Sequence, residues 1–313
     1  MGSKTVRLGV STDFNPVPAQ YLSTSAVRDQ ATIDRLSASV TNPFFGIPGF
    51  GVTSFYSSRT IARSQLLKPF PEFSGLSTSL PAGSSWYNAL TAHFERRMTR
   101  GLMLQANYTW SKTLDATSYR SPTDSLPEHV VSDLDRPHRL VLLGMYELPF
   151  GRGKRFASNA SGIVDAVIGG WQMQADWQLQ SGPPLAWGNI IYTGNFTDIA
   201  LPTSERSVSR WFNTSGFERT ANKQLASNIR YFPSRISGAR ADGINMADLS
   251  LFKTFRVREK LRLQLRGEAE GVTNHPNFNP PNMTPNNSLF GVVSRTQTAQ
   301  EERRIFVGLK LLF

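Results

Sequence analysis

Apolar and polar residues alternate without a break from position 171 to position 180 (WQMQADWQLQ). The apolar members are Trp171, Met173, Ala175, Trp177 and Leu179. Successive side chains of a β-strand point to opposite faces, so a strand would collect these residues on one side and the glutamines on the other. A helix would spread the glutamines around its whole circumference. The segment is therefore predicted to be a strand with one apolar and one polar face.

The same alternation recurs along the chain. Clear examples are 86–98, 102–111, 261–270 and 304–313, and weaker ones are 140–148 and 247–255. The runs are as long as the tilted strands that cross a bilayer, about 9–11 residues, whereas strands of soluble proteins average about 5–6 residues. Alternation alone also fits a soluble antiparallel sheet with one face on a core. The strand length favours an all-β fold, a segment of an antiparallel transmembrane β-barrel with about seven long strands.

The connections between these strands alternate between short and long. Residues 99–101 and 256–260 form short ones, and a small apolar stretch at 163–168 is expected to form one or two helical turns between two strands. The long connections, rich in polar residues, are 112–135, 181–245 and 274–303. Such long connections are uncommon in compact soluble domains. Short periplasmic turns and long extracellular loops are the arrangement of outer-membrane barrels.

Composition excludes several other classes. The chain has 313 residues, no cysteine and a net charge of +11, and it is low in both hydrophobic (39%) and charged (18%) residues. Without cysteine it has no disulfide framework and no thiolate metal site. Neutral polar residues replace the missing apolar ones, which argues against a disordered polyelectrolyte. No apolar run reaches the length of a membrane-spanning helix, about 18–20 residues.

Basic residues gather beside the short turns. They are Arg96, Arg97 and Arg100 at the first, Arg152, Lys154 and Arg155 at the second, and Lys253, Arg256, Arg258 and Lys260 at the third. A nucleic-acid-binding protein would use such residues on phosphates, but no nucleic-acid-binding motif accompanies them, so nucleic acid is not an expected partner. A membrane sheet would place them against anionic lipid headgroups. Outer-membrane lipid is therefore the expected partner.

The residues do not form a pattern typical of catalysis or metal binding. The histidines, His93, His129, His138 and His275, are scattered. Asp133 and Asp135 lie near His138, but loop polarity explains them better than a metal does. Residues 150–154 (FGRGK) lack the spacing of a phosphate-binding loop and are expected to form a turn. We therefore expect no enzymatic activity, no cofactor and no metal.

The chain ends in an alternating segment whose last residue is aromatic (VGLKLLF). The segment resembles the signal that outer-membrane barrels present to their assembly machinery, with Gly308, Leu311 and Phe313 at the positions of that signal. Phe306 departs from that pattern, which prefers a polar residue at its position. The barrel-assembly machinery is therefore a second expected partner.

Short segments along nearly the whole chain resemble, in their order, the C-terminal part of a TonB-dependent outer-membrane receptor of the Oar-like type common in acidobacteria. These segments are 15–22 (NPVPAQYL), 66–71 (LLKPFP), 86–90 (WYNAL), 108–112 (YTWSK), 146–151 (YELPFG), 170–172 (GWQ) and 274–278 (NHPNF). The resemblance implies uptake of a siderophore, vitamin or glycan-type ligand across the outer membrane. It also implies a signal peptide, a plug and a barrel of about 22 strands. The chain corresponds to the last part of that barrel, so contact with TonB would be made only through the plug region, and the chain is expected to be a truncated product or fragment with open sheet edges.

On this interpretation, residues 1–85 form an extracellular loop region that can include the remnant of a strand end, and residues 86–313 form the C-terminal barrel strands. The residues expected to face the lumen are Gln172, Gln174, Asp176, Gln178, Arg262, Gln264, Arg266, Glu268 and Glu270. The residues expected to face lipid are Trp171, Met173, Trp177, Leu179, Leu261, Leu263 and Leu265. Two alternatives remain open: a secreted soluble β-sheet domain for binding or adhesion, and a non-functional fragment.

Overall fold

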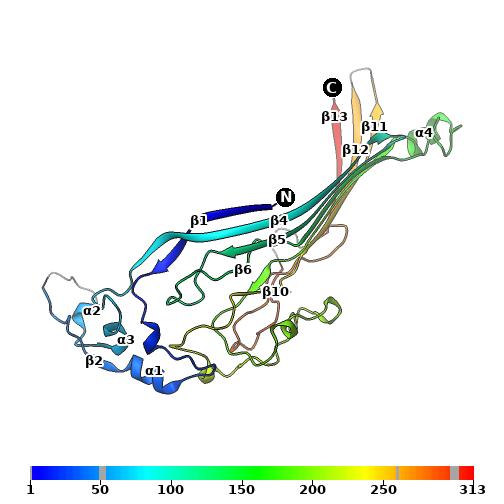
Figure 1. Cartoon of the computed structure of the whole chain (residues 1–313). Helices are drawn as coiled ribbons and strands as arrows, with labels where there is room; N and C mark the ends of the chain where they lie inside the picture. Colours follow the sequence, from blue (N-terminus) through cyan, green and yellow to red (C-terminus); the bar gives the residue numbers. More distant parts are fainter. Residues whose placement is uncertain (1, 49–53, 259–260, 297–302) are drawn as a thin grey trace.

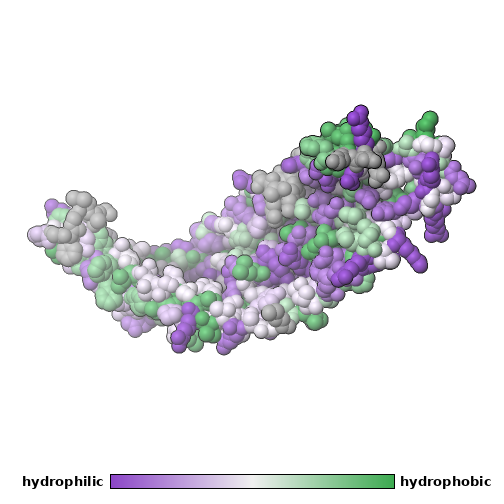
Figure 2. Space-filling model, turned by 90° about the horizontal axis from the view of Figure 1, so that it is seen from above, coloured by the Kyte–Doolittle hydropathy of each residue, from purple (hydrophilic) through white to green (hydrophobic). Residues whose placement is uncertain are grey.

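The computed structural model describes residues 2–48, 54–258, 261–296 and 303–313, and one long, curved sheet dominates it (Figure 1). In pairing order its strands are β1 (Gly2–Asp13), β4 (Ser77–Thr99), β5 (Leu102–Ala116), β7 (His138–Glu147), β8 (Trp171–Gln180), β11 (Ile244–Arg256), β12 (Arg262–Glu270) and β13 (Arg304–Leu312). Every neighbouring pair is antiparallel, and the short strand β6 (Val130–Val131) pairs with the end of β5. Among the described residues β1 and β13 each pair on one side, so the sheet is an open partial barrel. Seen from above, the molecule curves into an arc (Figure 2).

All seven strands expected from alternation form, and the expected helical turns form helix α4 (Gly162–Ile168). Strand β1 was not expected as a complete strand. Because β1 pairs with the first half of β4, β4 starts at Ser77, and the boundary expected at residue 85 falls inside it. Leu261 was expected inside the sixth strand but belongs to the turn before β12, since its N–H donates to the Arg258 carbonyl. Glu259 and Lys260 of that turn lie outside the described residues.

Two residues, Arg100 and Gly101, determine the turn between β4 and β5. Thr99 pairs with Leu102, and the residues between them, Arg100 and Gly101, have φ angles of 53° and 79°. Positive φ at both central positions is typical of the type I′ turn, whose twist matches the twist of the strands. A β-carbon on Gly101 would also lie 3.1 Å from Cβ of Glu147 on β7, so glycine fits both the angle and the space.

The long connections form a second body, which we call the loop body, at the end of the sheet opposite the short turns (Figure 1, lower middle). Strands β9 (Pro184–Ala186) and β10 (Arg235–Arg240) pair within it, and its core is rich in aromatic rings. The core residues are Leu185, Trp187, Ile190, Tyr192, Ile199, Trp211, Phe212, Phe217, Phe232, Ala239, Ala241, Phe290 and Val293. Trp187 stacks on Phe217 with ring centroids 5.4 Å apart. The connections are rich in polar residues, yet their aromatic and aliphatic residues form a packed core.

The described part of the connection between β1 and β4 also contains regular structure. Its elements are α1 (Gln30–Ser37), β2 (Ser39–Thr41), α2 (Ser54–Ser57), β3 (Thr60–Ala62) and α3 (Arg63–Leu66), and a 3-10 turn lies at Ala19–Tyr21. Three more 3-10 turns lie between β8 and β11, at Phe196–Ile199, Thr203–Glu205 and Ala221–Lys223. Asn15 is fully buried and closes this connection, because its amide donates to the carbonyls of Phe70 (2.8 Å) and Phe73 (2.9 Å). Among the described residues no helix is both long and apolar enough to cross a membrane.

Helix α1 gives a pH-dependent prediction. Asp29 caps its N-terminus by accepting hydrogen bonds from the Thr32 N–H (3.0 Å) and hydroxyl (2.7 Å). These bonds hold the pKa of Asp29 below its usual value. A carboxyl whose folded-state pKa is lowered stabilises the fold above its unfolded-state pKa, and that stabilisation is lost as the pH falls through the folded value. We expect Asp29→Ala to speed amide hydrogen exchange in α1 near neutral pH, and we expect the difference between the variant and the parent chain to disappear once the pH falls below the folded-state pKa of Asp29. Asp34→Ala, in the middle of the same helix, is the control, and equal acceleration by both variants would contradict the capping role.

Candidate functional site

Strand pairing assigns each side chain of the sheet to one of two faces. Residues directly opposite each other in an antiparallel pair project to the same face. Trp177 lies opposite Leu142 of β7 and Ala247 of β11. Leu265 of β12 lies opposite Lys253 and Leu309. Followed strand by strand, these registers divide the sheet into an apolar face and a polar face.

The apolar face runs across seven strands. Its members are Leu90, Ala92 and Phe94 of β4, Leu102, Leu104, Ala106, Tyr108 and Trp110 of β5, Leu140, Leu142, Gly144 and Tyr146 of β7, Trp171, Met173, Ala175, Trp177 and Leu179 of β8, Ala247, Leu249 and Leu251 of β11, Leu263, Leu265, Gly267 and Ala269 of β12, and Ile305, Val307, Leu309 and Leu311 of β13. The structure therefore brings together all the residues expected to face lipid except Leu261, which precedes the paired part of β12.

The apolar face is not sealed inside a core. Trp177 is 39% exposed, Leu90 64% and Leu309 67%, whereas Trp171 and Leu263 are half-buried. The largest fully buried side chains, Phe212 and Phe232, lie in the loop body instead. Soluble monomers rarely expose contiguous apolar surface of this extent, so this face requires an apolar environment.

The polar face carries every residue expected to face the lumen. These residues are Gln172, Gln174, Asp176, Gln178, Arg262, Gln264, Arg266, Glu268 and Glu270. Arg266 and Glu268 form an ion pair, and Gln264 donates to the Thr254 hydroxyl at 3.2 Å. On β4 and β5 the same face carries His93 and Asn107, whose side chains are 2.7 Å apart. Paired polar groups thus extend along this face from β4 to β12.

Several residues depart from this division. Apolar residues that project to the polar face include Met103 of β5, Val141, Leu143 and Met145 of β7, Met246 and Phe252 of β11, and Phe306 of β13. Cations that project to the apolar face include Arg96 of β4, Lys112 of β5 and Lys253 of β11. Lys253 had been grouped with the cations expected to meet lipid headgroups. It is instead only 4% exposed, because its ammonium lies under α4, 2.5 Å from the Ala166 carbonyl.

The C-terminal strand leaves one of its edges unpaired in the described sheet. Gly308 lies opposite Arg266 and Leu311 opposite Leu263, while Phe313 follows the last residue of β13 and is 98% exposed. The three residues expected to form the assembly signal therefore lie on an accessible strand, and recognition by assembly machinery stays a prediction.

Asp135 joins the sheet to the loop body. Its side chain is fully buried and accepts hydrogen bonds from the Thr113 N–H (2.6 Å) and from Nη2 of Arg240 on β10 (2.5 Å). Nζ of Lys112 lies 3.8 Å from the same carboxylate. Among the described residues no group of three or more acidic, histidine or cysteine side chains could hold a metal ion. Asp135 is therefore a structural tie between β5 and β10.

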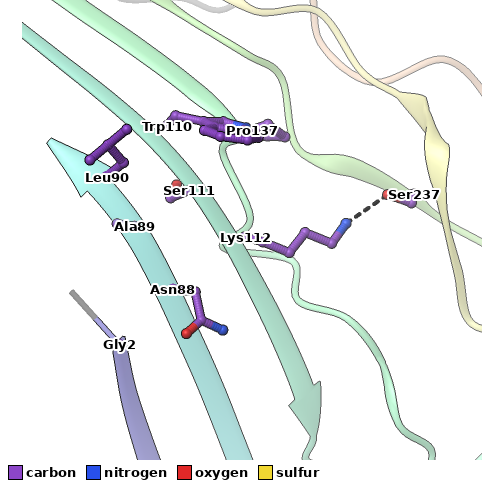
Figure 3. Close-up of a pocket in the computed structure, with 9 residues that line it drawn as sticks. All are labelled: Gly2, Asn88, Ala89, Leu90, Trp110, Ser111, Lys112, Pro137 and Ser237. Carbon is purple, nitrogen blue, oxygen red and sulfur yellow. Dashed lines mark hydrogen bonds between the residues drawn. The ribbon is translucent and has the colours of Figure 1, made fainter.

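A pocket of about 800 Å³ lies where the apolar face meets this junction (Figure 3). It is lined by Gly2, Asn88, Ala89, Leu90, Trp110, Ser111, Lys112, Pro137 and Ser237. Leu90 and Trp110 supply its apolar wall, and Lys112 reaches across from β5 to the Ser237 hydroxyl at 2.7 Å (Figure 3).

A second pocket, of about 460 Å³, lies where the loop body meets the connection between β1 and β4. It is lined by Val27, Arg28, Ile191, Thr193, Gly216, Phe217, Glu218 and Lys223. Hydrogen bonds from Thr220 hold the pKa of Glu218 below its usual value, so this carboxylate is ionised near neutral pH. The pocket therefore presents both signs of charge beside an apolar wall.

A family model described as an outer membrane beta barrel domain matches residues 1–306. The chain belongs to this family. The barrel domain is thus an outer-membrane protein. In outer-membrane barrels the long loops lie on the extracellular side and the short turns on the periplasmic side. The comparisons with curated proteins and with solved structures found no match.

Besides strand β1, two features of the barrel domain were not predicted from its sequence. The aromatic core of the loop body has a visible signal, since Trp187, Trp211, Phe212 and Phe217 lie in a connection that is otherwise polar. The tie between Asp135 and Arg240 has no such signal, because the two residues are 105 positions apart.

Proposed function

We propose that this barrel domain is the C-terminal part of a TonB-dependent outer-membrane transporter, with the apolar face against lipid and the polar face along the path of an imported ligand. The observation that carries the proposal is the division of one continuous sheet into two such faces. Lysine or arginine facing lipid at mid-membrane costs about 2–4 kcal/mol. In the described strands the middle of the apolar face carries no charged residue; Lys253 and Arg96 lie at its end with the short turns, and Lys112 lies at its end with the loop body.

The chemistry of the polar face and of the loop body supports a polar ligand. Amides and both signs of charge line the face, and the loop pocket of about 460 Å³ lies within the usual range of ligand sites, about 300–1,000 Å³. A siderophore, a vitamin or a glycan fragment could use such groups. In this proposal the barrel domain is not an enzyme, and energy reaches it from TonB through a plug.

The plug is the decisive test of TonB dependence. The DNA upstream of the first codon is expected to encode a plug domain in frame. Cells that carry the intact gene are expected to lose uptake of the siderophore, vitamin or glycan-type ligand when TonB is deleted. Uptake that continues without TonB would contradict the proposal while leaving the barrel assignment intact.

The second candidate is a secreted soluble β-sheet domain for binding or adhesion, and the packed core of the loop body favours it. Extraction of membranes with alkaline carbonate separates the two candidates. An integrated barrel domain is expected to stay in the membrane pellet because its apolar face is held by lipid. Release into the supernatant together with a soluble periplasmic marker would support the adhesion domain instead.

A further inference from the structure

Helix α4 lies against the apolar face of the sheet, at its periplasmic end (Figure 1, upper right). Two side chains of that face hold its carbonyl groups. Nζ of Lys253 donates to the Ala166 carbonyl at 2.5 Å, and Nε1 of Trp171 donates to the Val167 carbonyl at 2.8 Å. Because Lys253 and Trp171 lie opposite each other on β11 and β8, α4 is fixed beside the strands rather than below the opening of the barrel.

This attachment aims the apolar side chains of α4 away from the protein. Ile163 is 83% exposed, Val167 64% and Val164 47%. Phe150 and Phe156 of the same connection are also exposed and lie against each other, with ring centroids 5.5 Å apart. Figure 2 shows hydrophobic residues on the surface at this end of the molecule.

Cations border this apolar surface. Arg152 and Arg155 are exposed, and the Arg155 guanidinium lies over the Phe156 ring at 5.5 Å. Lys154 is engaged differently, since its ammonium pairs with Glu147 at 3.0 Å. An apolar helical surface beside cations is the pattern of a helix that lies in a membrane interface, and cations there are attracted to anionic headgroups.

The burial of Lys253 also has an explanation in this arrangement. A lysine that faces lipid is costly, but this ammonium is covered by α4, bonded to its carbonyls and placed over the rings of Trp171 (5.8 Å) and Phe255 (5.0 Å). The same contacts satisfy carbonyl groups at the end of a helix, which have no partner within it. Lys253 is therefore a positioning residue for α4.

We propose that α4 is an interfacial anchor that sits in the periplasmic leaflet of the outer membrane, with Ile163, Val164 and Val167 among acyl chains and Arg152 and Arg155 on phospholipid phosphates. The proposal rests on the apolar face being the lipid-facing side, and it commits to phospholipid as the occupant. Continuity between the exposed side chains of α4 and the apolar face, together with the two cations, favours lipid over a protein partner.

The chain has no cysteine, so single labels test this placement directly. The full chain is prepared with Ile163→Cys, Val167→Cys or, as a polar control in the same connection, Asn159→Cys, and carries an environment-sensitive fluorophore in phosphatidylethanolamine–phosphatidylglycerol vesicles. Labels at 163 and 167 are expected to shift to the blue and to be quenched by brominated phospholipid, and the label at 159 is not. A label at Trp177→Cys reports the apolar face independently.

The possible outcomes separate the two proposals. Water-like emission at 163 and 167 with quenching at 177 would overturn the anchor and leave the facing of the sheet intact. A blue shift without quenching would mean that protein covers α4, which also overturns the anchor. Loss of quenching at 177 as well would contradict the proposed function itself.

Two further variants test the individual contacts. Lys253→Met is expected to reduce quenching at 163 while leaving the β-sheet circular dichroism unchanged. Unchanged quenching would contradict the role of Lys253 in positioning α4. Each cation near an anionic surface strengthens binding to that surface by a factor of about five. We therefore expect stronger quenching at 163 by brominated phosphatidylglycerol than by brominated phosphatidylcholine. The double variant Arg152→Gln, Arg155→Gln is expected to abolish that difference, and a difference that persists would contradict the role of the arginines.

Discussion

Lysine in place of Trp177 is expected to prevent stable integration of the barrel domain into the outer membrane. Trp177 stands near the middle of β8 on the apolar face, opposite Leu142 and Ala247. A lysine facing lipid near the bilayer midplane costs about 2–4 kcal/mol, and this cost falls towards the interface. Leu263, the second residue of β12, lies near the periplasmic turn, so Leu263→Lys is expected to be milder than Trp177→Lys.

The matched controls lie on the polar face of the same strands. Gln174→Lys on β8 and Gln264→Lys on β12 are expected to integrate normally, because their side chains point to water in this account. Trp177→Phe controls for loss of the hydrogen bond from Nε1 of Trp177 to Oδ1 of Asn245 (2.9 Å). The measurement is the fraction of protein that resists carbonate extraction from outer membranes. Equal losses on both faces would refute the assignment of the faces.

Removal of the Phe232 ring is expected to unfold the loop body without releasing the sheet from the membrane. Phe232 is fully buried, and its ring contacts Phe196 (5.0 Å between centroids) and Trp187 (5.7 Å). Substitution of a buried phenylalanine by alanine costs about 3–5 kcal/mol. Phe232→Ala is therefore expected to make the connection between β8 and β11 sensitive to protease added outside the cell.

Phe196 provides the control for this prediction, because it is the same residue type in the same connection but is 41% exposed. Phe196→Ala is expected to cost much less and to leave the connection resistant. Similar protease sensitivity in both variants would mean that the aromatic core does not hold the loop body together. Loss of Phe232→Ala from the membrane would mean that the sheet depends on the loop body.

The strands were predictable because each strand has an apolar and a polar side, and this shows in its own sequence as alternation of apolar and polar residues. From β4 to β13 every expected strand formed, and the pairing collected most of the apolar residues of these strands on one face. Strand β1 escaped prediction for a physical reason. Its alternating Val6, Leu8 and Val10 are interrupted by register shifts, and Arg7 has a φ of 61°, so the periodic signal is short and irregular.

The contacts that hold the rest together are not local, and alternation carries no information about them. In the sequence Lys253 is one of several cations near a turn. Its hydrogen-bond partner in the structure belongs to a helix 87 positions away in the sequence. Asp135 and Arg240 meet only once the loop body has folded onto the sheet. Membership of a residue in a face was therefore predictable, whereas the ties between connections and sheet required the structure.

A single-cysteine scan along β8 tests the central claim most directly. β8 is paired on both edges, so accessibility reports its faces rather than an open edge. With the protein in outer membranes, a membrane-impermeant thiol reagent is expected to label cysteines that replace Gln172, Gln174, Asp176 and Gln178. Brominated lipid is expected to quench fluorophores attached to cysteines that replace Met173, Ala175 and Trp177. Labelling and quenching that alternate at every residue would support a sheet between lipid and water, and uniform values along the strand would contradict it.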